Sequence, residues 1–123
     1  MNNLNKIKKK YIELANIHVI CSTNGKSAEA NNAYRKLKKI FMQLKMEKMD
    51  RSILIDLLNE DNPTRLWAAS HMLGLQYYTK TALSVLEKIA VANTDSLNTI
   101  AKIISFNAKL TAKIYRDKGF LNF

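Results

Sequence analysis

Apolar residues recur at three- and four-residue spacings along most of the chain, which is the period of amphipathic helices. No segment sustains the alternation of apolar and polar residues that is typical of strands. The pattern therefore predicts an all-α protein with about six helices. We expect these at about residues 3–22 and 27–49, from 50 or 52 to about 58, at 62–74, from 79 or 81 to about 90, and from 94–95 towards 116.

The fourth expected helix has the clearest boundaries. Asn62 is a suitable N-cap, Pro63 suits the first helical position, and Gly74 suits a left-handed stop. Ala68 and Ala69 are small enough to let neighbouring helices approach closely. These residues predict a short helix that another helix can approach closely.

The remaining boundaries are less sharply marked. Ser27 is a plausible cap for the second helix, and residues 94–95 are expected to begin the sixth. We expect residues 119–123 to be a tail in which Phe120 and Phe123 both fold back onto the helices.

The two later helix pairs are related by an offset of about 32 residues in the sequence. At this offset Leu54 aligns with Leu86 and Ala69 with Ala101. That period lies in the range of helical solenoids. The expected organisation is one domain over residues 1–123: a helical pair over 1–49, two repeat-like pairs over 50–118 and the tail. A plain six-helix bundle would give similar patterning.

The segments 54–58, 61–65 and 68–69 are similar to the HEAT-repeat pattern of a leucine-rich helix, a turn aspartate and an arginine-led helix with paired small residues. The whole arrangement resembles a small bacterial HEAT-like family, some members of which are immunity proteins that neutralise secreted polymorphic toxins. The resemblance implies antiparallel helix pairs in a short, right-handed HEAT/ARM-like solenoid. It also implies a structural pairing of Asp61 with Arg65.

Charge and cysteine content restrict the class of partner and the compartment. The formal net charge is +10, and residues 1–50 hold eleven basic against four acidic side chains. Such an excess favours an anionic partner, although a Lys-rich composition shared by all proteins of one source would produce it too. Cys21 is the only cysteine, so no internal disulfide forms. Polar Glu13 and His18 interrupt a segment that otherwise mimics a secretion signal, and we expect a cytoplasmic protein with no membrane span.

The second helix carries the sharpest candidate surface. Arg35, Lys39, Met42 and Met46 line up at helical spacing, and Lys38 flanks them. Basic side chains steer a protein partner, and methionines supply adaptable apolar area. Alternatively, the methionines pack against neighbouring helices and the lysines are a solvated face.

Other constellations are weaker. Trp67 and Tyr78 are either interface anchors or a lid on a small core. His18 and Cys21 stand three residues apart, as in half a metal site, but no second cysteine exists, and a pair buried in a helix interface is the simpler interpretation. No glycine-rich phosphate loop or nucleophile motif is present, so we predict no catalytic residue, metal site or cofactor.

These observations favour a non-enzymatic protein-binding module. Together with the resemblance, they predict an immunity protein that occludes the active site of a cognate secreted toxin, possibly a nuclease of a contact-dependent growth inhibition system. The binding residues would be Arg35, Lys38, Lys39, Met42 and Met46, followed by Trp67 and Tyr78. The alternative is a nucleic-acid-binding helical repeat that uses residues 8–10 and 35–39 on phosphates. Oligomeric state is left open.

Overall fold

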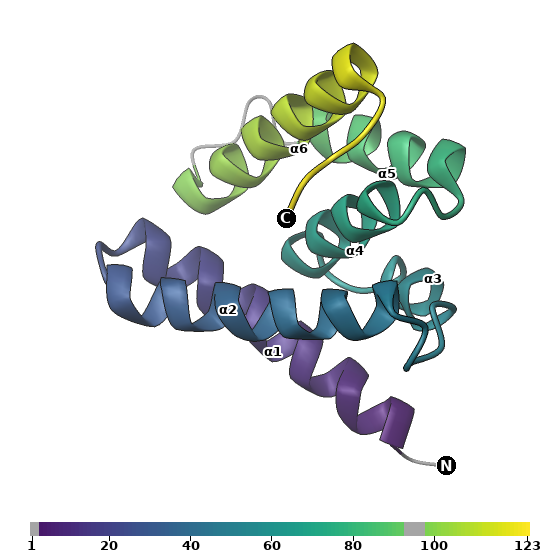
Figure 1. Ribbon diagram of the computed structural model, residues 1–123. Helices are drawn as coiled ribbons and strands as arrows, with labels where there is room; N and C mark the ends of the chain where they lie inside the picture. The colour runs from purple at the N-terminus through teal and green to yellow at the C-terminus, as the bar shows by residue number, and fades with distance from the viewer. Residues whose placement is uncertain (1–2, 93–97) are drawn as a thin grey trace.

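A computed structural model describes residues 3–92 and 98–123, and over these ranges the chain is all-helical, as predicted. The six helices of the described residues are close to those expected (Figure 1). Their bounds are α1 (Asn3–Thr23), α2 (Ser27–Lys45), α3 (Ile53–Leu57), α4 (Asn62–Gly74), α5 (Thr79–Val91) and α6 (Thr99–Lys118). The expected start of the last helix at residues 94–95 lies outside the described residues.

Helix α4 is the centre of the fold, because it packs against α1, α3, α5 and α6 (Figure 1). Ala68, Ala69, Met72 and Leu73 are fully buried on it, which agrees with the close approach predicted from the paired alanines. Helix α2, in contrast, packs mainly along α1. Much of the surface of α2 is therefore left for solvent or a partner.

Helix α2 ends at Lys45, four residues earlier than predicted. The next turn contains Glu47 with a φ of 59°, a left-handed conformation that an α-helix does not continue through. The guanidinium of Arg51 donates hydrogen bonds to the carbonyls of Leu44 (3.0 Å) and Lys45 (3.2 Å). Arg51 thereby satisfies carbonyl groups that the helix end leaves without intrahelical donors.

The cap of α4 is Asp61 and not Asn62 as predicted. The backbone N–H of Thr64 donates to Asp61 Oδ1 at 3.1 Å, and Asn16 of α1 donates to Asp61 Oδ2 at 3.1 Å. The carboxylate is favoured here because it also lies at the positive end of the helix dipole. The predicted Asp61–Arg65 pair is wrong, since Arg65 donates to Asn62 Oδ1 at 2.8 Å.

The tail, residues 119–123, folds back only in part. The Phe123 ring packs against Phe41, with a centroid separation of 4.8 Å, and against His71 of α4 at 5.0 Å. Phe120 remains 47% exposed, contrary to expectation. Gln76 anchors the turn before the tail, because its side-chain N–H donates to the Gly119 carbonyl at 2.9 Å.

Helix α4 ends at Gly74, as predicted, but Gly74 is not a left-handed stop because its φ is not positive. A Cβ added at Gly74 would lie 2.7 Å from Cε2 of Phe123 and 3.1 Å from Cε1 of Phe41. The glycine is therefore needed for the close approach of the Phe123 ring. A local motif could not reveal this, because the contact joins residues far apart in the chain.

We expect Gly74→Ala to release the Phe123 ring and leave the helices folded. Alanine favours a helix by about 1 kcal/mol over glycine, which offsets part of the lost ring packing, so the free energy of unfolding should change by less than about 1 kcal/mol. The aromatic resonances of Phe123 should move toward random-coil positions, while exposed Ser84→Ala should leave them in place. A Phe123 ring that stays docked in the Gly74→Ala variant would contradict this assignment.

Candidate functional site

The basic–methionine face of α2, defined as Arg35, Lys38, Lys39, Met42 and Met46, points to solvent. Met42 is 39% exposed and Met46 is 58% exposed, so neither methionine is buried in the core. The opposite side of the helix is buried through five residues: Ala30, Ala33, Leu37, Phe41 and Leu44. The α2 sequence thus separates a core side from an exposed cationic side with apolar side chains in it.

The cationic groups of this face have no acidic partners. Arg35, Lys38 and Lys39 take part in no ion pair with any residue that the structure describes, and Glu29 is the only acidic residue of α2. The N-terminal basic cluster differs, because Lys8 pairs with Asp56 at 3.3 Å and Lys10 with Glu13 at 3.4 Å. Uncompensated positive charge is thus concentrated on α2 more than on α1.

Trp67 does not belong to the basic–methionine face. It is half-buried on α4 and lies within an aromatic cluster, with ring centroids 5.1 Å from His18, 5.9 Å from Tyr34 and 5.6 Å from His71. These contacts join α1, α2 and α4 on the inner side of α2. The location agrees with the alternative in which Trp67 covers part of the core.

Tyr78 lies apart from that cluster, in the turn between α4 and α5. It is 60% exposed and contacts Tyr77 edge-on at 4.7 Å. Its backbone is left-handed, with a φ of 48°, which is uncommon for a bulky residue and costs on the order of 1 kcal/mol. The structure therefore places the seven predicted residues in three locations: four on α2 with Met46 directly after its last residue, Trp67 in the aromatic cluster and Tyr78 in a turn.

His18 and Cys21 lie in a helix interface. The His18 ring packs against both Trp67 and Tyr34, and partial burial lowers its pKa. Cys21 is a half-buried free thiol. Across residues 3–92 and 98–123, no group of three or more His, Cys, Asp or Glu residues is arranged to hold a metal ion.

An exposed apolar surface on α6 was missed by the sequence analysis. Phe106 is 64% exposed, and Leu110 is 44% exposed. Ile114 follows at the same four-residue step. The sequence did contain a hint of this exposure. Ile104, Ala108 and Ala112 form the buried side of α6, and Phe106, Leu110 and Ile114 are offset from them around the helix axis.

Comparisons of the chain with protein-family models, with curated proteins and with solved structures give no match. Within the part of the chain that is described, no helix combines the length and apolar character needed to cross a bilayer. Functional inference therefore depends on the surfaces themselves.

Proposed function

We propose that the chain is a non-enzymatic protein-binding module that docks through the basic–methionine face of α2 onto an acidic surface of its partner. The observation that carries this proposal is the presence of two exposed methionines among unpaired cations on one helical face. The cations accelerate encounter, and the thioethers contribute apolar area that becomes buried on binding. Binding by a preformed helix requires little rearrangement.

The most specific form of the proposal is a cytoplasmic immunity protein that covers the active site of a cognate bacterial toxin. It is supported by the resemblance of the whole arrangement to a HEAT-like family in which some members are immunity proteins. We extend it to the helix arrangement: α3–α4 and α5–α6 would be two stacked antiparallel pairs that follow the α1–α2 pair. The packing of α4 against α3, α5 and α6 supports this arrangement.

A nucleic-acid-binding protein is the second candidate, because the cations of α2 are uncompensated. Exposed methionines argue against it, since a thioether gains nothing from a phosphate. Carboxylate partners for Lys8 and Lys10 also reduce the positive charge available on α1. The two candidates differ in their dependence on salt.

The test begins with isolation of the tagged chain from its native cells and identification of what copurifies. For a protein partner, Arg35→Glu combined with Lys39→Glu and Met42→Glu should weaken binding about 100-fold, because charge repulsion and loss of apolar contact act together. If the partner is a toxin, the unaltered chain should abolish its activity and protect cells that express it, whereas the variant should not.

The matched control is Phe106→Ser with Leu110→Ser on α6, which should retain affinity within about threefold. Loss of binding in this control but not in the α2 variant would move the interface to α6 and contradict the proposal. Copurified nucleic acid whose affinity falls by about 10³-fold or more between 50 and 200 mM salt would support the second candidate instead.

A further inference from the structure

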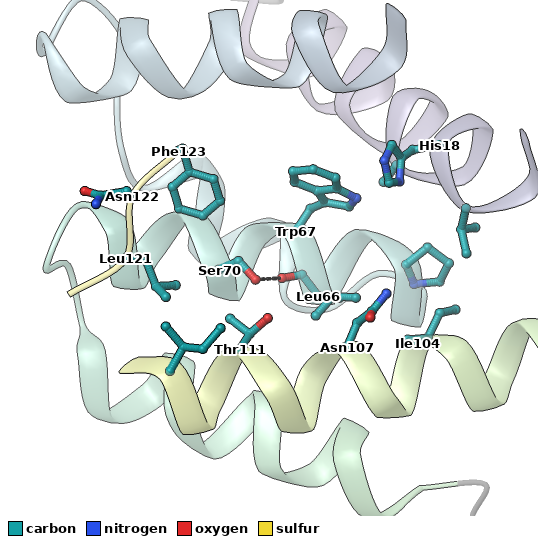
Figure 2. Close-up of a pocket in the computed structure, with 14 residues that line it drawn as sticks. His18, Leu66, Trp67, Ser70, Ile104, Asn107, Thr111, Leu121, Asn122 and Phe123 are labelled. Atoms are coloured by element: carbon teal, nitrogen blue, oxygen red, sulfur yellow. Dashed lines mark hydrogen bonds between the residues drawn. The ribbon is translucent and has the colours of Figure 1, made fainter. Parts of the chain in front are cut away.

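A cavity of about 290 Å³ lies between α1, α4, α6 and the tail, away from the basic–methionine face (Figure 2). His18 and Trp67 are on one side of it, and Asn107 and Thr111 of α6 are on the other. Most of the remaining wall is apolar and includes Val19, Leu66, Ile104, Ile114 and Leu121. Its size is at the lower end of the range for small-molecule sites.

Among residues 3–92 and 98–123, no Asp, Glu, Lys or Arg side chain lines this cavity, although the chain as a whole has a net charge of +10. An ionised ligand would therefore lose hydration without gaining a charged partner. Protonation of His18 gives little compensation, because partial burial lowers the pKa of its ring. The cavity selects for uncharged ligands.

Hydrogen-bonding groups are nevertheless available at the cavity. Asn107 and Thr111 are one helical turn apart, and neither side chain makes a hydrogen bond to a residue that the structure describes. The same holds for the indole N–H of Trp67, whereas the hydroxyl of Ser70 already donates to the Leu66 carbonyl at 2.6 Å. A few convergent polar groups on an apolar wall are what orient small ligands in their sites.

The tail gives the cavity its fourth wall. Leu121 and Phe123 line it. The Phe123 ring packs against Phe41 and His71 and lies close to Gly74, which has no side chain. This wall is therefore formed before any ligand arrives, which reduces the ordering cost of binding.

We propose that the cavity binds a neutral, ring-containing small molecule whose polar edge hydrogen-bonds to Asn107 and Thr111 while its ring lies against Trp67. The aromatic wall suits a planar ring, since edge-to-face contacts with tryptophan add to simple burial. The proposal concerns the inner side of the fold and does not depend on the partner proposed for α2.

The probes for the test are benzamide and benzoate, which have the same shape and differ in charge. Trp67 is the only tryptophan, so its fluorescence reports on this cavity directly, and backbone amide shifts in NMR spectra locate the binding. Benzamide should give saturable changes with a dissociation constant of about 1 mM, as is usual for such small ligands. Benzoate should bind at least about tenfold more weakly than benzamide. Non-specific attraction to a cationic protein would give the opposite order, because benzoate is an anion.

Asn107→Leu should weaken benzamide binding about three- to tenfold through loss of a hydrogen bond. Because this position is exposed, the variant should remain folded. Lys109→Leu, at an exposed position of α6 outside the cavity lining, is the control and should leave binding unchanged. Equal affinity for both probes, equal effects of both variants or shifts that never saturate would overturn the proposal. Shifts of cavity residues on raising the protein concentration alone would assign the cavity to a second copy of the chain and overturn it too.

Discussion

Lowering the pH from 6.5 to 4.5 should reduce the free energy of unfolding by about 2 to 3 kcal/mol through His71 alone. His71 is completely buried, and burial lowers its pKa from 6.5 to about 3. No charged group contributes to that shift, because the ring lies among Tyr11, Phe41, Trp67 and Phe123. Protonation would thus place an unpaired charge in the core.

The direction of the effect follows from proton linkage. The unfolded chain takes up a proton at His71 below about pH 6.5, whereas the folded chain resists protonation until about pH 3. The stabilisation is therefore complete above pH 6.5, falls at close to 1.4 kcal/mol per pH unit below it, and is lost near pH 3. Burial lowers the pKa of His18 as well, which adds a smaller change of the same sign.

Urea unfolding of the unaltered chain and two variants between pH 7 and 4.5 provides the measurement. Tyr11 Oη lies 2.7 Å from His71 Nδ1, so Tyr11→Phe with His71→Phe removes both members of this buried pair and should flatten the pH dependence. His18→Gln is the control and should retain most of the slope. If His18→Gln flattens the profile and the double variant does not, His71 is not the group responsible.

The spacing of apolar residues alone predicted the positions of the helices well. Most of the errors concern features that depend on contacts between helices. On α2 the polar residues lie on one side of the helix, so the pattern leaves little choice about which side is buried, and Ala33, Leu37 and Leu44 on the apolar side are buried. Helix α6 has apolar residues on more than one side, and the phase there was ambiguous. The pattern of this helix therefore did not show that Leu110 is exposed.

The errors at α4 have a different origin. Asp61 and Asn62 are both good caps, and sequence does not choose between them. The hydrogen bond from Asn16, which is 45 positions away, accompanies the choice of Asp61. Gly74 resembles a helix stop in sequence, but its contact with Phe123 arises only once the tail has docked.

In the candidate site, too, features within one helix could be predicted from the sequence, whereas features that depend on contacts between helices could not. The α2 pattern placed the basic–methionine face opposite the core side of the helix, but it left open whether Met42 and Met46 pack against neighbouring helices. The separation of Trp67 from this face did not follow from sequence, since it depends on how α4 is rotated against α1 and α2. The cavity between α1, α4 and α6 was missed for the same reason, because no single segment contains its wall.

Truncation of Leu37 on the buried side of α2 should lower the free energy of unfolding by about 2 to 5 kcal/mol. Leu37 has no exposed surface and belongs to the main hydrophobic cluster, so Leu37→Ala leaves a cavity that its neighbours fill only in part. Met42→Ala and Met46→Ala on the same helix should change the free energy by less than about 0.5 kcal/mol, because both side chains are exposed. Urea unfolding of the three variants at pH 7 measures the difference.

The comparison within one helix distinguishes core residues from docking residues. Methionines that contribute little to folding but whose truncation weakens partner binding about tenfold would be retained for recognition. If Met42→Ala or Met46→Ala destabilised the chain as much as Leu37→Ala, the thioethers would belong to the core in solution. The proposed face would then hold only lysine and arginine, a composition that fits phosphate better than protein, and the nucleic-acid candidate would be favoured.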